Sequence, residues 1–387
     1  MLGHPVFLVT LLLLLTGQSS VLEAKIQTSG HFSPADSYVF QGKEPQKLFR
    51  ILQGRKWGYI NSAGTVVIKP QFVDASDFSE GLAFVRYPEK EKPLKPGQKS
   101  PELIIAAGYI DETGKVVLEM ESPLYLVGDG FREGLTRIWL WVSGQGNLYG
   151  YVDRSGKIII KPKFNLAYPF VDGLAAACID RKCGFIDKAG EFAIEPKFAT
   201  VQSFSEGFAV VGVDIESVGF VNKSGELAIP PQFGNQGSIG FREGMSAVVF
   251  PGGPYGFINT EGVLAIPMQF EQTLAFSEGL APVYVKGKWG YIDKAGKYVI
   301  EPQFVFAGGF SEGLAPYGLT PMSASLHATQ GNREDSGFGY IDKTGKVVIE
   351  PRFDRTYNFI DGLARVEVDG GWAYIDKTGK YVWKATK

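Results

Sequence analysis

Residues 288–304, KWGYIDKAGKYVIEPQF, followed by FSEGLA at residues 310–315, form the phrase that decides the fold of this chain. Variants of the phrase recur through almost everything after residue 48. The glycine before its aromatic residue marks each copy: Gly58, Gly108, Gly150, Gly184, Gly219, Gly256, Gly290 and Gly339, with Ala373 in the last. Neighbouring markers are 50, 42, 34, 35, 37, 34, 49 and 34 residues apart, so the chain holds nine copies of a 34-residue unit. A fixed period of this size is typical of repeat arrays, solenoids and propellers.

Each unit has the residue pattern of antiparallel strands joined by turns. Two β-prone runs, Tyr291-Ile292 and Tyr298-Val299-Ile300, flank the turn Asp293-Lys294-Ala295-Gly296, a hairpin pattern with glycine where a left-handed residue is needed. Pro302 ends the second run because proline has no N–H for a ladder. Residues 280–285 supply a preceding strand. We therefore predict a three-stranded antiparallel meander in each unit, followed by a loop carrying Phe and Glu/Asp-Gly.

The predicted strands are apolar on both faces, since neighbours such as Tyr291 and Ile292 point in opposite directions. A lone sheet of this kind leaves an apolar face in water, and packing against the next repeat removes it. We expect an all-β fold in which the ~34-residue units stack as an open β-solenoid or superhelical array. A closed propeller-like ring is the alternative, although nine units exceed the usual ~4 to 8 blades.

The repeated phrase resembles the WG-repeat family, also called KWG repeats. The match covers roughly residues 48 to 384, and the Trp that names the family stands at Trp57, Trp289 and Trp372. Other residues take its place elsewhere, which indicates a packing position: Ala107, Tyr149, Cys183, Val218, Tyr255 and Phe338. The resemblance implies a bacterial, often exported, β-rich repeat protein without a general enzymatic assignment.

Composition narrows the possible partners. The chain has 387 residues, 49 of them Gly, and a formal net charge of −2. Nearly neutral charge argues against nucleic-acid binding, which needs a basic surface. Abundant Gly and aromatic residues agree with an all-β array.

The N-terminal region predicts export. Residues 6–16 form an apolar run too short for a typical membrane helix, and Gly17-Gln18-Ser19 follows it. We interpret residues 1–24 as a signal peptide, with an uncleaved anchor as the main alternative. Residues 25–47 are a linker or irregular cap, and residues 48–387 are the array. We expect a secreted, periplasmic or cell-envelope protein with no membrane span after signal cleavage.

Two insertions, residues 88–101 and 320–336, interrupt the units. Both replace the turn between the first and second predicted strands, so both should emerge at the same edge of the array. Such insertions are either extra surface loops that the fold tolerates or the edge at which the protein binds a partner.

Cys178 and Cys183 lie across a predicted hairpin turn. In an exported protein this pair predicts a disulfide, with free thiols as the alternative. A metal site is not expected because, beyond the signal, only His31 and His327 could join the sulfurs.

The recurring acids before glycine argue against catalysis, since an active site needs one asymmetric constellation. We expect them to accept hydrogen bonds from loop backbone N–H groups: Glu80, Glu133, Asp172, Glu206, Glu243, Glu278, Glu312 and Asp361. Trp139 and Trp141 share one face of a predicted strand. Packing is the favoured role for them, and a platform for stacking sugar rings is the other.

These observations predict a non-catalytic protein without a cofactor that presents a binding or scaffolding surface. The partner class is a protein or a cell-envelope polymer. The alternative is an envelope hydrolase with its site between the 88–101 and 320–336 insertions.

Overall fold

The computed structural model describes residues 48–385 except 89, 92–102, 105–106, 121–123, 215, 236 and 320–336. The predicted signal peptide and linker, His31, His327 and most of both insertions therefore lie outside the described residues. All described residues belong to one compact unit, Lys43–Lys387. Every regular element among them is a strand.

The strands form nine main sheets, called blades 1 to 9 in chain order, and each is built from consecutive, antiparallel strands. Blades 1 to 3 are β1 (Leu48–Gln53), β2 (Lys56–Asn61), β3 (Val66–Phe72); β4 (Asp74–Ala75), β5 (Leu82–Arg86), β8 (Ala107–Asp111), β9 (Val116–Glu119); and β10 (Leu124–Leu126), β11 (Leu135–Val142), β12 (Gly146–Asp153), β13 (Ile158–Phe164). Blades 4 to 6 are β14 (Leu166–Ala167), β15 (Ala175–Ile179), β16 (Lys182–Ile186), β17 (Phe192–Phe198); β18 (Thr200–Val201), β19 (Phe208–Gly212), β20 (Ser217–Asn222), β21 (Leu227–Gly234); and β22 (Met245–Val249), β23 (Tyr255–Asn259), β24 (Leu264–Phe270). Blades 7 to 9 are β25 (Gln272–Thr273), β26 (Ala281–Val285), β27 (Lys288–Ile292), β28 (Tyr298–Phe304); β29 (Phe306–Ala307), β30 (Leu314–Gly318), β31 (Phe338–Asp342), β32 (Val347–Phe353); and β33 (Arg355–Ile360), β34 (Leu363–Val368), β35 (Gly371–Asp376), β36 (Tyr381–Lys384). A separate pair, β6 (Lys90–Glu91) and β7 (Leu103–Ile104), lies between β5 and β8.

Seven of the nine blades have four strands, so the predicted three-stranded unit is one strand short. The additional strand has two residues in five of these blades, three in blade 3 and six in blade 9. In blade 8, for example, β29 pairs with β30 through Phe306 and Ala307. Such a strand carries no alternation signal, which is why the sequence predicted a loop there.

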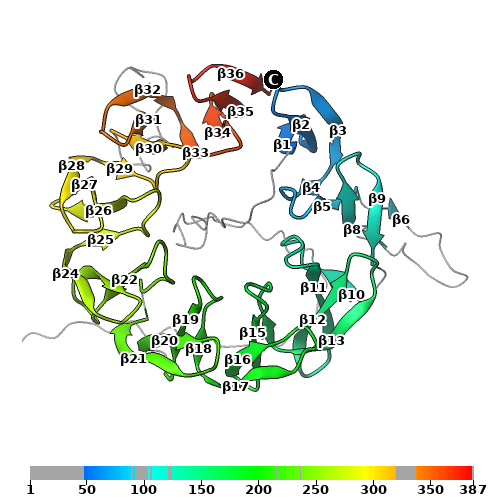
Figure 1. Ribbon diagram of the computed structural model, residues 1–387. Helices are drawn as coiled ribbons and strands as arrows, with labels where there is room; N and C mark the ends of the chain where they lie inside the picture. The colour runs from blue at the N-terminus through cyan, green and yellow to red at the C-terminus, as the bar shows by residue number, and fades with distance from the viewer. Residues whose placement is uncertain are drawn as a thin grey trace, which may run out of the picture. The chain divides into compact units, whose positions relative to one another are not determined.

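The last strand of each blade lies at the outer perimeter (Figure 1) and is only half buried. In β28, Val299 is 45% exposed whereas Ile300 is 3% exposed. The expectation of two apolar buried faces is thus correct for Tyr291 and Ile292, which are fully buried, and wrong for this outer strand. Pro302 lies inside β28, so the prediction that it ends this strand is wrong. The free edge of an outer strand tolerates proline, which there hinders pairing with another chain.

The marker glycine is required by a register shift beside it. Trp289 pairs with Phe304 and Tyr291 with Ile300, so β28 bulges opposite Gly290. A Cβ on Gly290 would lie 2.6 Å from the Ile300 carbonyl oxygen, which no side chain allows. In blade 9 the outer strand lacks the proline. It pairs with β35 without a register shift at Ala373, so the alanine side chain is accommodated opposite Lys384.

The core consists of nine apolar clusters, one at each junction between neighbouring blades. The ninth cluster joins blade 9 to blade 1 and includes Phe49, Ile51 and Tyr374. The predicted open solenoid is therefore wrong, and the alternative, a closed propeller ring, is correct (Figure 1). An open array would leave the apolar faces of its first and last sheets in water, and closure buries them against each other.

Closure joins two complete sheets, and no described sheet mixes strands from the two chain ends. The Tyr374 hydroxyl donates to the Arg50 carbonyl oxygen at 2.9 Å. The Phe49 and Tyr374 rings meet edge to face with centroids 5.4 Å apart. Ring closure therefore depends on side-chain packing and hydrogen bonding across the junction, with no exchange of strands between the described sheets.

Candidate functional site

The two ends of the ring carry different kinds of turn. One end, here called the motif face, holds the Ser-Glu-Gly turns before the second strand of a blade and the Asp-Lys-Ala-Gly type turns before the last strand. The two kinds touch, since the Lys343 ammonium lies 3.1 Å from the Glu278 carboxylate. Because the strands are antiparallel, the hairpin turns between the second and third strands lie at the opposite end, here called the turn face.

On the motif face the recurring acids bind the next blade. Glu278 of blade 7 accepts a hydrogen bond from the Gly313 amide of blade 8 at 3.0 Å. Five equivalent bonds run from Gly134 to Glu80, Gly173 to Glu133, Gly244 to Glu206, Gly279 to Glu243 and Gly362 to Glu312. A cation of that next blade adds an ion pair in most of these junctions, for example Arg154 with Glu80, Lys188 with Glu133, Lys294 with Glu243 and Lys377 with Glu312.

The predicted role of these acids as acceptors for loop N–H groups is confirmed for these six glutamates, but the sequence did not identify the next blade as the donor. The sequence does contain a signal for this contact between blades. Glu278 and Gly279 both have positive φ, 52° and 88°, in a tight turn that ordinarily takes Asn or Asp at the first position. Glutamate is disfavoured there and has the extra length needed to reach the neighbouring blade. Asp172 is one methylene shorter, and within the described residues it makes only an ion pair with Lys223, at 3.4 Å.

A second set of junction bonds comes from buried tyrosines of the marker motif. The Tyr291 hydroxyl donates to the Gly308 carbonyl oxygen of the next blade at 2.8 Å, and Tyr340 donates to the Tyr357 carbonyl oxygen at 2.7 Å. Burial raises the pKa of both phenols well above the ordinary value. These hydroxyls therefore stay protonated as structural donors.

The motif-face hairpin turns are closed by the side chain of their first residue. In the turn after β31, the Asp342 carboxylate accepts the Thr344 and Lys346 amides at 2.9 and 3.1 Å. The hydrogen bond from the Thr344 hydroxyl is the main cause that lowers the Asp342 pKa. The motif face is thus occupied by bonds that hold the turns and the blades together.

The turn face is where the blades differ from one another. The two predicted insertions belong here, because β5 pairs with β8 and β30 with β31, and those strands flank residues 88–101 and 320–336. The expectation that both insertions start from the same edge is confirmed by this pairing.

The predicted disulfide is present and lies beneath a turn of this face. Cys178 of β15 pairs with Cys183 of β16, and their sulfurs are bonded. Asp180 and Arg181, which form the turn above them, both have positive φ, 49° and 62°. Asp tolerates this conformation at the first position of a tight turn, whereas it is unfavourable for Arg181 at the second, which ordinarily takes glycine. The Asp180 amide donates to the Asn165 side-chain oxygen at 2.9 Å, which further holds the turn.

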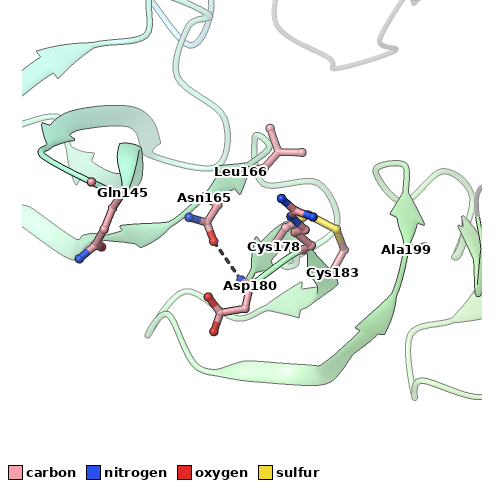
Figure 2. Close-up of a pocket in the computed structure, with 9 residues that line it drawn as sticks. Gln145, Asn165, Leu166, Cys178, Asp180, Cys183 and Ala199 are labelled. Atoms are coloured by element: carbon pink, nitrogen blue, oxygen red, sulfur yellow. Dashed lines mark hydrogen bonds between the residues drawn. A yellow bond between two sulfur atoms is a disulfide. The ribbon is translucent and has the colours of Figure 1, made fainter.

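An open pocket of about 650 Å³ surrounds this turn. Figure 2 shows its lining, with Gln145 from blade 3 on one side, Asn165 and Asp180 in the middle and Ala199 of blade 5 on the other. Polar groups therefore line a depression that crosses three neighbouring blades.

Trp139 and Trp141, for which packing was the favoured role and a stacking platform the alternative, lie on the adjacent hairpin of blade 3. Trp139 stacks on Tyr125 with ring centroids 4.5 Å apart and planes inclined by 20°. Trp141 is 62% exposed. Packing thus accounts for Trp139 but leaves Trp141 open to solvent.

The naming tryptophans are placed as the resemblance suggested. Trp57 and Trp289 are partly buried and pack against the clusters between blades 1 and 2 and between blades 7 and 8. Trp372 lies in a cation–π contact, 4.7 Å from the Arg365 guanidinium. Each contributes to packing within the ring.

Within the part of the chain that the structure describes, no group of three or more His, Cys, Asp or Glu residues is arranged to hold a metal ion. A search of those same residues finds no helix long and apolar enough to cross a membrane.

A family model described as WG containing repeat matches seven segments, which together cover more than half of the chain: residues 57–87, 149–183, 184–214, 219–250, 255–289, 289–318 and 338–372. No curated protein matches the sequence.

Several solved structures are similar in fold. The computationally designed Ika8 protein is 11% identical with a TM-score of 0.45, and the match covers 88% of this chain and 98% of Ika8. BamB from Moraxella catarrhalis is 9% identical with a TM-score of 0.39, over 78% of this chain and 99% of BamB. PorZ, a surface component of the type-IX secretion system of Porphyromonas gingivalis, is 11% identical with a TM-score of 0.29, over 86% of this chain and 45% of PorZ. At these values the likeness carries no argument about function.

Proposed function

The chain belongs to the WG containing repeat family, and from that premise we propose that it is a non-catalytic, exported protein whose turn face binds a protein or a cell-envelope polymer. The observation that supports this proposal is a difference between the two ends of the ring. Motif-face side chains such as Glu278 and Asp342 already bind neighbouring backbone. The turn face holds the insertions, the exposed Trp141 and the pocket around Asp180.

Export is supported by two independent features. The apolar run at residues 6–16 has the length of a signal-peptide core. The Cys178–Cys183 disulfide is the kind of bond that persists outside the reducing cytosol.

The hydrolase alternative has no specific observation in its favour among the described residues. A carboxyl group that acts as general acid has a raised pKa, whereas the pKa values of Asp111 and Asp342 are lowered, first of all by hydrogen bonds within their own turns. Binding is therefore the function we propose.

The test compares two full-length variants for retention of envelope components on the immobilised protein. In the turn-face variant, residues 88–105, 140–148 and 320–336 are each replaced by the short Lys286-Gly287 turn of blade 7, which keeps the strand register. In the motif-face variant, Lys294→Thr and Lys343→Thr remove two exposed cations, following Thr260 at the same position of blade 6. We expect the turn-face variant to lose the partner and the motif-face variant to keep it. Equal retention by both, or loss only from the motif-face variant, contradicts the proposal.

A further inference from the structure

The hairpin of blade 3 projects beyond its neighbour. Its strands β11 and β12 have eight residues each, whereas β15 and β16 of blade 4 have five. Ile138 lies opposite Gly150 just as Ala177 lies opposite Gly184, so these pairs are equivalent. Beyond them β11 continues for four residues and β15 for two, so two further residues per strand extend the blade 3 hairpin by roughly 7 Å.

One face of this hairpin carries aromatic rings. Tyr125, Trp139 and Tyr149 are direct cross-strand neighbours, and Trp141 follows on the same face because strand side chains alternate. Tyr149 packs against the cluster between blades 3 and 4, so this face is directed toward blade 4.

The length difference explains why Trp141 is uncovered. Counting from the equivalent glycine pairs, Trp139 is level with Cys178, and Trp141 is level with the turn that ends β15. No strand of blade 4 extends far enough to cover it. Trp141 is 62% and Tyr125 38% exposed, and Trp139, stacked on Tyr125, supports the ring platform.

The hairpin that carries the rings is itself polar but uncharged. From Ile138 to Val152 the chain has no Asp, Glu, Lys or Arg, although 80 of its 387 residues are of these types. Asn147 lies directly opposite Trp141, and Gln145 lines the neighbouring pocket (Figure 2). The turns of blades 1, 4 and 7 instead carry charged residues, at Arg55, Arg181 and Lys286.

This chemistry fits a neutral sugar chain. The C–H face of a pyranose stacks on a flat aromatic ring, and side-chain amides both donate to and accept from its hydroxyl groups. The hairpin offers a charged polymer no counter-charge, and the facing Asp180-Arg181 turn carries one charge of each sign. A ridge two strands wide is also narrow for a protein partner, which ordinarily needs about 800 Å² on each side.

We propose that the blade 3 hairpin binds a neutral polysaccharide strand, with Trp141 and Tyr125 stacking on sugar rings and Gln145 and Asn147 binding hydroxyl groups. The inference rests on the proposed function, because it names the polymer that the turn face takes.

The test is calorimetric titration of the full chain with neutral hexasaccharides of β-1,4-glucose, β-1,4-N-acetylglucosamine, β-1,4-mannose and α-1,4-glucose, and with oligogalacturonate as an anionic control. At least one neutral hexasaccharide should bind more tightly than the anionic one. Trp141→Ala should weaken that binding at least tenfold, Trp141→Phe should weaken it only a few-fold, and Asn147→Ala should fall between them. Thermal unfolding of all variants should match the wild type, because Trp141 is exposed.

Absence of binding to all four neutral sugars, or equal affinity of Trp141→Ala and wild type, overturns the inference. The proposed function has its own separate test, which is the retention of envelope components on the immobilised protein. If the turn-face variant loses its partner while Trp141→Ala keeps it, the turn face binds something other than a glycan through this hairpin.

Discussion

The motif face and the turn face are built from the same strands, yet their turns are held in opposite ways. At the motif face, the strained Glu278-Gly279 turn is held by the next blade, through the Gly313 amide and the Lys343 ammonium. At the turn face, the strained Asp180-Arg181 turn is held within its own blade, by Asn165 and the disulfide. Turns that join blades must stay alike, whereas turns held locally can vary. The face that can vary is the one available for binding.

The largest expected effect comes from removing three motif-face acids together. Glu243→Ala, Glu278→Ala and Glu312→Ala each delete one charge-assisted bond to the next blade. We expect a loss of about 1 kcal/mol per site in the free energy of unfolding, or about 3 kcal/mol in total, since the sites share no partner. Urea unfolding measures it.

The matched control carries Gln at the same three positions. Glutamine keeps an acceptor oxygen but loses the ion pairs, so it should retain more than half of the lost stability. An alanine variant within about 0.5 kcal/mol of the wild type would show that the acids do not join the blades.

A smaller and more local effect is expected at the turn face. Reducing the Cys178–Cys183 bond releases a loop closed over a sequence separation of 5, which should lower the free energy of unfolding by about 2 kcal/mol at most. Unfolding in the presence and absence of reductant measures it, with the double Cys→Ala variant as the control that reductant should not affect. Collapse of the whole ring on reduction would contradict the view that this bond acts within one blade.

Lengthening the short acid should strengthen its junction. Asp172→Glu brings the carboxylate within reach of the Gly207 amide, as Glu133 reaches Gly173, and should add about 1 kcal/mol to the free energy of unfolding. Glu278→Asp is the reciprocal variant and should lose a similar amount. If shortening destabilises while lengthening has no effect, side-chain length is not what limits the Asp172 junction.

The smallest effect concerns the pH dependence of the motif-face turns. Hydroxyl hydrogen bonds from Thr113, Ser155 and Thr344 are the main cause that lowers the pKa of Asp111, Asp153 and Asp342. A lowered folded-state pKa means that the stabilisation is present above the unfolded-state value, ~3.9, and is lost as pH falls through the folded-state value.

Replacing these three aspartates with asparagine should leave stability near pH 7 almost unchanged, since Asn61, Asn222 and Asn259 close the same turn in blades 1, 5 and 6. The variant should lose less stability than the wild type between pH 5 and pH 3 in urea titrations. An identical acid response would mean that the loss arises elsewhere in the ring.

Much of the local structure could be predicted from residues that act within one unit. The Asp293 turn, the strand runs around it and the Cys178–Cys183 pair follow from turn chemistry and hairpin spacing. The two-residue strands such as Phe306–Ala307 could not be predicted, because their position depends on pairing with the strand that follows. The exposure of Trp141 depends on the lengths of two neighbouring hairpins and on how their blades are placed.

The sequence by itself determined the number of units, three strands of each unit and the end of the blade at which the insertions start, since these depend on short-range periodicity and turn residues. Only the tertiary structure decided that the array closes. Open and closed arrays share one period and differ in the rotation between blades, about 40° for nine blades. That rotation is set by how side chains from two blades pack, as Phe49 packs on Tyr374 at the last junction, and contacts across 325 positions of chain leave no local pattern.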